Sequence, residues 1–140
     1  MKSLKVKKIM TANPFIISPT QTIKEAAQQM KKIDCGVLPV GGQDKVIGII
    51  TDRDIVLRVV AAGLSPDKVT VQEVMTKKVH SCDEDDDVED AAEQMRKRNV
   101  ARLIVTHDKK TTGIITMKCL LQGKGKQKKS NNVLHELLRA

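Results

Sequence analysis

The apolar positions near the start of the chain recur at helical spacing. Ile23, Ala26 and Met30 fall on one face of a helix, with polar residues between them. Thr22 and Glu25 have the spacing of a capping box, in which each side chain satisfies a free backbone N–H group at a helix start. This pattern predicts a helix that begins after Thr22 and packs one apolar stripe against a core.

Two short runs rich in valine and isoleucine follow this helix. They cover residues 37–40 and 46–50, and the segment 41–44 between them contains two glycines and an aspartate. Such runs on either side of a turn-forming segment are typical of paired strands. A second helix is expected over residues 52–62, because a glycine and a proline follow it.

The same order of elements occurs twice along the chain. A shift of 65 residues superimposes 6–55 on 71–120 without a gap, and about fifteen of the fifty aligned positions are identical. A repeat of this length predicts two copies of one structural unit. One copy alone would form a small sheet whose apolar face is not covered well enough for the unit to be stable by itself. The two copies are therefore expected to pack through their sheets with pseudo-twofold symmetry, leaving a cleft for a small ligand between them.

The predicted fold class is α/β in the broad sense (α+β), with two units of the order β-α-β-β-α. The first unit is assigned to residues 1–66 and the second to residues 67–122. Residues 123–140 form a basic linker and a short amphipathic helix, whose leucines lie at three- and four-residue spacing. A helix of about six residues is marginal alone, so it is expected to dock on this domain, its dimer mate or a separate partner.

Composition and charge narrow the function. The 140 residues carry 25 basic and 17 acidic side chains, a formal net charge of +8 that favours a partner with phosphate, either nucleic acid or nucleotide. Phe15 is the single aromatic residue, which argues against recognition of single-stranded nucleic acid by base stacking. No apolar run reaches the length of a membrane span, and no signal peptide is recognised. We therefore expect a cytoplasmic protein with no membrane partner.

Motifs for catalysis and metal binding are missing from the sequence. Cys35, Cys82 and Cys119 are odd in number and widely spaced, which fits a reducing compartment better than a disulfide framework. No cysteine or histidine pair has zinc spacing. The acidic run 83–90 lacks the ligand pattern of a calcium loop and is interpreted as a solvated helix start. With no nucleophile–base set visible, neither a metal site nor enzymatic activity is predicted.

The repeated order of motifs resembles a tandem pair of CBS domains, also called a Bateman module. The motifs are I/V-M-T, T-I-x-E-A-A-x-x-M, G-V-L-P-V and G-I-I-T-D-R-D-I, and the resemblance covers residues 6–122. It implies a stand-alone, non-catalytic sensor that binds an adenosine compound such as AMP, ADP, ATP or S-adenosylmethionine. It also implies a homodimer that passes ligand occupancy to an effector protein.

The family's ligand motif, G-h-h-T/S-x-x-D with h apolar, is complete at residues 48–54. The resemblance implies that Thr51 and Asp54 bind the ribose hydroxyls, and a carboxylate can accept hydrogen bonds from two vicinal hydroxyls. Phosphate would lie near Arg53 at the start of a helix. The residues expected beside the adenine are Val37, Leu38 and Pro39. Thr51 and Asp54 also have the spacing of a capping box, a role that can coexist with binding.

The second copy departs from this motif. Cys119 stands where the first copy has Asp54, and a thiol is a poor hydrogen-bond acceptor. A weaker second site is therefore expected around Arg102, Thr116 and Lys118, so that the two sites are unequal.

Two other functions stay open on the sequence alone. A basic protein associated with nucleic acid would account for the net charge and for the lysines of residues 124–129. A structural dimerisation module with vestigial sites would account for the repeat. The lack of aromatic residues disfavours the nucleic-acid hypothesis, as does the location of half of the net charge in residues 124–140.

Overall fold

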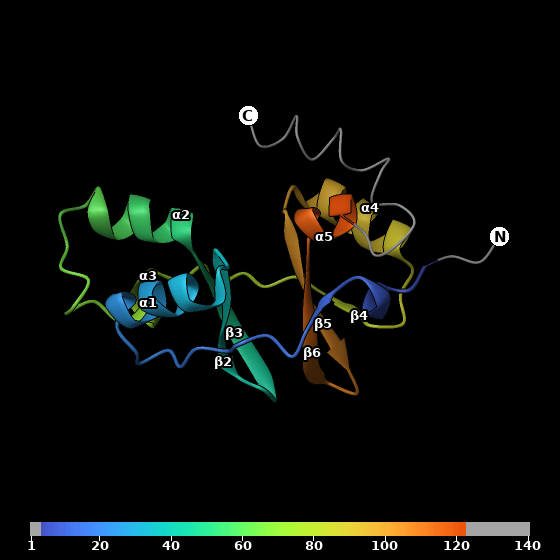
Figure 1. The fold of residues 1–140 in the computed structure, drawn as a ribbon, viewed down its shortest axis with the longest axis horizontal. Helices are drawn as coiled ribbons and strands as arrows, with labels where there is room; N and C mark the ends of the chain where they lie inside the picture. The colour runs from blue at the N-terminus through green and yellow to red at the C-terminus, as the bar shows by residue number, and fades with distance from the viewer. Residues whose placement is uncertain (1–3, 123–140) are drawn as a thin grey trace. The chain divides into compact units, whose positions relative to one another are not determined.

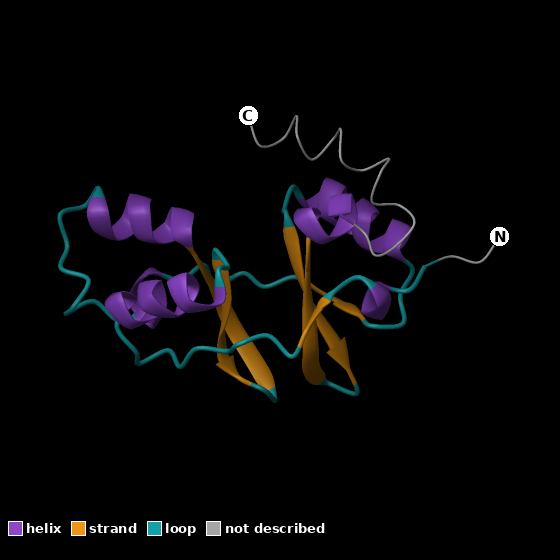
Figure 2. Ribbon diagram, viewed as in Figure 1, coloured by secondary structure: helices purple, strands orange, loops and turns teal. Residues whose placement is uncertain are grey.

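The computed structural model describes residues 4–122, so the predicted linker and helix of residues 123–140 lie outside the described part of the chain. The chain forms two compact units. One unit, called here the first-repeat unit, consists of residues 14–79, and the second-repeat unit consists of residues 4–13 together with 80–122. Each unit combines helices with strands, which confirms the predicted mixed fold class (Figure 2).

The first-repeat unit is built around an antiparallel hairpin (Figure 1). Its elements are α1 (Ile23–Ile33), β2 (Val37–Gly42), β3 (Lys45–Thr51), α2 (Asp52–Ile55), the π-helical turn η2 (Val56–Val60) and α3 (Val71–Val74). The pairing of β2 with β3 places Leu38 opposite Ile50. The paired strands predicted from the two β-branched runs are thus confirmed.

The local signals for helix ends are also confirmed. Glu25 N donates to Thr22 Oγ1 at 3.2 Å, and Thr22 N donates to Glu25 Oε1 at 3.1 Å, so the capping box starts α1 as predicted. The second predicted helix begins at Asp52, but it is α-helical only to Ile55 and continues as η2. It ends before Gly63, whose φ of 72° lies in the left-handed region that glycine adopts without strain.

A buried apolar cluster holds the first-repeat unit together. Ile23, on the predicted stripe of α1, is fully buried. The buried members of the cluster are Ile17, Ile23, Ala26, Met30, Leu38, Val40, Ile50, Val59, Val71 and Val74. Because α1, the hairpin, η2 and α3 all contribute, the cluster fixes the β3–α2 junction on which the candidate site lies.

The second-repeat unit contains a four-stranded sheet of order β1-β6-β5-β4. Its elements are the 3₁₀ turn η1 (Val6–Lys8), β1 (Thr11–Ala12), β4 (Ser81–Asp83), α4 (Val88–Arg98), β5 (Arg102–His107), β6 (Lys110–Thr116) and α5 (Met117–Gln122). β5 and β6 form a hairpin like that of the first unit, and β4 runs parallel to β5. The buried cluster of this unit comprises Val6, Ile9, Met10, Cys82, Ala91, Met95, Leu103, Val105 and Ile115.

Each unit takes its leading segment from the other sequence repeat. Thr11 in β1 pairs with Ile114 of β6, so the lead of the first repeat joins the hairpin of the second. In the other unit, Thr76 N donates to Ile49 O at 2.8 Å and Ile49 N donates to Thr76 O at 2.9 Å. The compact units therefore mix the two repeats. The division between residues 66 and 67, which follows the sequence repeat, stays a prediction about the repeat itself.

A glycine in each hairpin permits this close approach. A Cβ atom on Gly48 would lie 2.5 Å from Met75 Sδ and 3.0 Å from Thr76 O. A Cβ atom on Gly113 would lie 2.9 Å from Thr11 O and would also collide with Met10 Sδ. The Met-Thr pair of each lead thus packs directly on the shared Gly-Ile-Ile-Thr sequence of a hairpin.

We therefore expect Gly48→Ala and Gly113→Ala each to lower the free energy of unfolding by about 1–3 kcal/mol, because a methyl group must displace backbone as well as methionine. Urea unfolding measures the effect. Gly42→Ala is the matched control, since a Cβ atom there meets nothing within 4 Å. Equal stability of all three variants would contradict the close approach.

Across residues 4–122, no helix combines the length and the apolar character that crossing a membrane requires.

Candidate functional site

The complete ligand motif of the first repeat passes from the end of β3 into α2. Thr51 is the N-cap residue: its Oγ1 accepts from Asp54 N at 3.1 Å, and Asp54 Oδ2 accepts from Thr51 N at 3.1 Å. Thr51 and Asp54 are 7% and 9% exposed. The capping box that the spacing of Thr51 and Asp54 predicts is therefore confirmed. It engages one carboxylate oxygen of Asp54 through a backbone N–H group.

The other contacts of Asp54 are longer. Thr76 Oγ1 lies 3.5 Å from Oδ1 and 3.4 Å from Oδ2, and Arg58 Nη1 lies 3.7 Å from Oδ1. A charge-assisted N–H···O hydrogen bond is usually about 2.7–2.9 Å long. The Oδ1 atom therefore keeps capacity to accept further hydrogen bonds, although the residue as a whole is buried.

Thr76 and Arg58 were not identified as site residues from the sequence. Thr76 lies on the leading segment of the second repeat, which belongs to the first-repeat unit. Its alignment with Thr11 in the repeat does not by itself indicate a role. Arg58 lies four residues after Asp54, a spacing at which helical side chains meet. Arg58 Nη1 also donates to Val74 O at 2.7 Å, which holds the guanidinium beside the carboxylate.

The predicted adenine-contacting residues lie on β2 with different orientations. Leu38 belongs to the buried cluster beneath α1, and successive strand residues point to opposite faces of a sheet. Val37 and Pro39 therefore face the other side of the hairpin, where Val37 pairs with Thr51 in the strand register. A ligand beside Thr51 would meet the side chain of Val37 but only the backbone of Leu38. Arg53, expected near phosphate, is exposed on the first turn of α2.

The second-repeat unit has the same arrangement with a thiol in place of the carboxylate. Thr116 Oγ1 accepts from Cys119 N at 3.1 Å and lies 3.3 Å from Cys119 Sγ. Thr11 Oγ1 lies 3.9 Å from the same sulfur, in the position that Thr76 occupies beside Asp54. The local backbone geometry is thus shared by both units. The strong acceptor is present only in the first.

Basic side chains accompany this second arrangement. Arg102 pairs with Thr116 across the β5–β6 hairpin, so the structure brings two of the predicted residues together. The Nε atom of Arg102 is buried and has no hydrogen-bond partner within residues 4–122. Lys118 is exposed on the first turn of α5.

Of the other two cysteines, Cys82 belongs to the buried cluster of the second-repeat unit. Cys82 is buried on β4, and burial raises the pKa of its thiol to about 11, with smaller contributions from Asp86 and Asp83. Because the thiolate is the reactive form, this thiol is a weak nucleophile near neutral pH. Cys35, Cys82 and Cys119 are all free thiols.

Comparison with known proteins places the chain in a family. Residues 6–61 and 71–124 each match the CBS domain. The chain belongs to the CBS-domain family. It is 36% identical over 124 residues to the uncharacterized protein MK0525 of Methanopyrus kandleri, a match that spans 87% of this chain and 63% of that protein. The chain thus spans less than two thirds of that relative.

Two solved structures of CBS proteins are also similar. The CBS domain pair of protein MJ0100, solved in complex with 5′-methylthioadenosine and S-adenosyl-L-methionine, matches with a TM-score of 0.75 and 30% identity over 85% of this chain and 94% of that one. The hexameric CBS-CP12 protein from bloom-forming cyanobacteria matches with a TM-score of 0.80 and 29% identity over 88% and 73% of the two chains. This chain is accordingly a CBS pair, the arrangement found in regulatory modules.

Proposed function

We propose that this CBS pair is a non-catalytic sensor that binds an adenosine-containing ligand beside Asp54 and passes its occupancy to an effector protein. The carboxylate of Asp54 carries the proposal. Its Oδ2 accepts from the N–H of Thr51 at 3.1 Å, while within residues 4–122 Oδ1 has a long hydrogen bond from Thr76 at 3.5 Å and an ion-pair contact with Arg58 at 3.7 Å. A buried acceptor that is held in place and incompletely satisfied is suited to bind two vicinal hydroxyl groups.

The neighbouring residues fit the other parts of such a ligand. Val37 provides an apolar side chain for the base, and Arg53 and Arg58 provide positive charge for a phosphate. The ligand complex of the MJ0100 domain pair supports the adenosine class without deciding between AMP, ADP, ATP and S-adenosylmethionine. The free thiols favour a reducing compartment, and we place the sensor in the cytoplasm.

A thermal-shift series on the full chain tests the proposal. We expect at least one of AMP, ADP, ATP and S-adenosylmethionine to raise the melting temperature by several degrees, because ligand at roughly a hundred times its Kd adds about 2.7 kcal/mol of stability. Adenine and ribose 5-phosphate, which are the two parts of AMP, should each give a smaller shift. No shift with any of the four compounds would favour a structural module with vestigial sites.

We also propose that the sensor is a homodimer. Four large apolar side chains on and after η2 are exposed: Val56, Leu57, Val60 and Leu64 at 54, 50, 65 and 46%. Val59 of the same turn is fully buried, so Val56, Leu57 and Val60 lie on its outward side, and Leu64 follows after Gly63. An apolar helix face of this kind is a usual contact surface between copies.

We expect Val60→Asp to convert the dimer to a monomer in light-scattering measurements, because the interface would then bury an unpaired charge. Ile33→Asp is the matched control, since Ile33 is 40% exposed on a different helix. A wild-type chain that is monomeric at high concentration would contradict the dimer. A Val60→Asp variant that stays dimeric would place the interface elsewhere.

A further inference from the structure

Side chains typical of metal ligands meet at one end of the second-repeat unit. Ligand atoms of Asp83, Asp85 and His107 all lie within 4.8 Å of one another. Parallel pairing of β4 with β5 sets Asp83 opposite Thr106, which brings the acidic turn after β4 beside His107 at the end of β5. Sequence spacing predicts no metal site here, because the histidine and the acids are distant along the chain.

The imidazole of His107 is the group that distinguishes this cluster from an ordinary acidic turn. Its Nδ1 atom is buried and has no hydrogen-bond partner among the described residues. Glu84 Oε2 lies 3.8 Å and Asp85 Oδ2 lies 3.9 Å from this nitrogen. A buried polar atom is normally satisfied by a partner. Here the atom faces two carboxylates at distances too long for a hydrogen bond, so its capacity to bind a further partner is not used.

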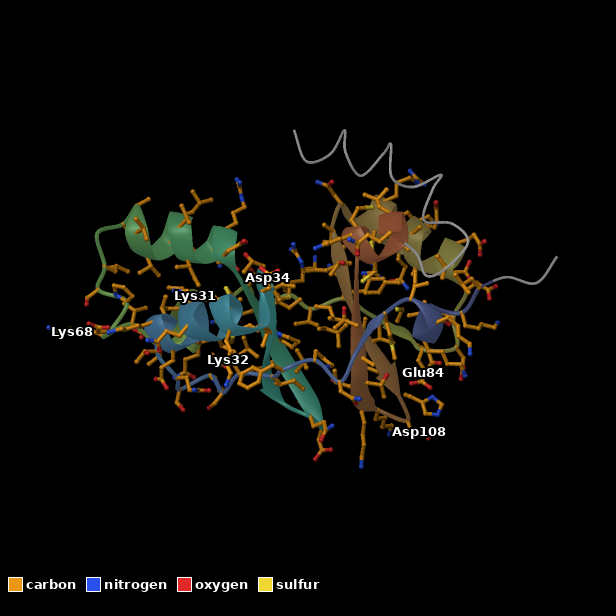
Figure 3. All side chains as sticks on the ribbon, viewed as in Figure 1. Lys31, Lys32, Asp34, Lys68, Glu84 and Asp108 are labelled. Atoms are coloured by element: carbon orange, nitrogen blue, oxygen red, sulfur yellow. The ribbon has the colours of Figure 1, made fainter. Side chains whose placement is uncertain are left out.

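The second ring nitrogen of His107 also faces a carboxylate. Asp108 Oδ2 lies 3.5 Å from Nε2. In Figure 3 the labelled Glu84, which follows β4, and Asp108, in the β5–β6 turn, lie at the same end of the second-repeat unit. Histidines that bind metals usually present their other N–H group to a carboxylate, which keeps the lone pair on the ligating nitrogen. Asp108 can accept a hydrogen bond from Nε2–H, which keeps the lone pair on Nδ1 for the ion.

We propose that Asp83, Asp85 and His107 bind one divalent transition-metal ion of the Zn²⁺ type, with Glu84 or water as the fourth ligand. Imidazole nitrogen favours such ions over Mg²⁺ and Ca²⁺, which prefer oxygen ligands alone. Ligands about 2.0–2.1 Å from a tetrahedral Zn²⁺ ion are about 3.3 Å apart. Asp85 and Glu84 lie 3.9 and 3.8 Å from Nδ1, and the three ligand atoms lie within 4.8 Å of one another. The side chains would therefore close by up to about 1.5 Å around the ion.

Lys7 competes with the ion for Asp85. Its Nζ atom lies 2.9 Å from Oδ1, whereas the oxygen nearest to His107 is Oδ2. The lysine therefore leaves the proposed ligating oxygen accessible but lowers the negative charge of the site. The side chains of His107 and Asp85 are 44% and 50% exposed, so the cluster lies at the surface, and the buried Nδ1 becomes accessible to an ion once these side chains move.

Zinc titration of the tag-free full chain against a competing chelator tests the site. We expect one Zn²⁺ equivalent, with an affinity that falls at least about tenfold in His107→Gln and in Asp85→Asn. Lys7→Gln should raise the affinity. His80→Gln is the matched control, because His80 Nδ1 lies 2.9 Å from Arg98 Nη1 and the residue is not a member of the cluster. Circular dichroism of each variant shows that the fold is retained.

Two outcomes would overturn the proposal. One is a Zn²⁺ affinity that is absent in the wild-type chain or unchanged by His107→Gln. The other is a thiolate charge-transfer band in the Co²⁺-loaded protein, which would assign the metal to a cysteine. A Co²⁺ spectrum with only nitrogen and oxygen ligation, lost in His107→Gln, supports the site.

Discussion

Asp54→Asn is expected to lower the affinity for the adenosine ligand by at least about a hundredfold. The substitution keeps the size of the side chain and an oxygen that can accept from Thr51 N, so the cap of α2 is retained. It removes the negative charge that the ribose hydroxyls would contact. Hydrogen bonds to a charged group contribute about 1.5–3 kcal/mol each, and two of them account for the expected loss. Isothermal titration measures the change.

The second repeat provides the matched controls for this experiment. Cys119→Ser changes the equivalent position without adding charge and should leave binding at the first site unaltered. Cys119→Asp completes the ligand motif of the second repeat and should increase the affinity of that unit for the ligand. An Asp54→Asn variant that binds like the wild type would show that Asp54 serves only as a helix cap.

Leu38→Ala is expected to lower the free energy of unfolding by about 2–5 kcal/mol, the usual cost of removing a large side chain from a packed core. Leu38 is 1% exposed in the first-repeat cluster, and its aligned partner Leu103 is fully buried in the second. Leu103→Ala should have a similar effect. Guanidinium unfolding measures both variants.

A substitution at an exposed position is the control for the loss of core packing. Ile47→Ala removes a side chain that is 39% exposed on β3, and it should cost less than about 1 kcal/mol. Because the Leu38 side chain faces the core, the folded Leu38→Ala variant should bind the adenosine ligand with nearly unchanged affinity. A large loss of affinity with little loss of stability would place the side chain in the ligand site instead.

The parts of the structure that sequence predicts well depend on residues close together in the chain. The capping boxes of Thr22 with Glu25 and of Thr51 with Asp54 each lie within four residues, and both form as the pattern indicates. The β2–β3 hairpin is likewise local. Local hydrogen-bonding groups determine these elements, so their positions can be read from spacing alone.

The exchange of the leads could not be predicted in this way. Met10 and Thr11 are identical to Met75 and Thr76, and both hairpins carry the glycine on which such a pair packs. The residue pattern therefore allows either leading segment to pack on either hairpin. The three-dimensional path of the chain determines which pairing forms. The role of Thr76 beside Asp54 was missed for this reason. The cluster at His107 was missed because strand pairing, not spacing, brings its members together.

The stoichiometry of ligand binding tests the central claim most directly. Isothermal titration of the wild-type chain with the adenosine compound that gives the largest thermal shift should show one strong site per chain, and Asp54→Asn should abolish it. A weaker second event at the unit that contains Arg102 and Lys118 is compatible with this result. Two equal sites per chain, or strong binding that survives in Asp54→Asn, would contradict the proposed sensor site.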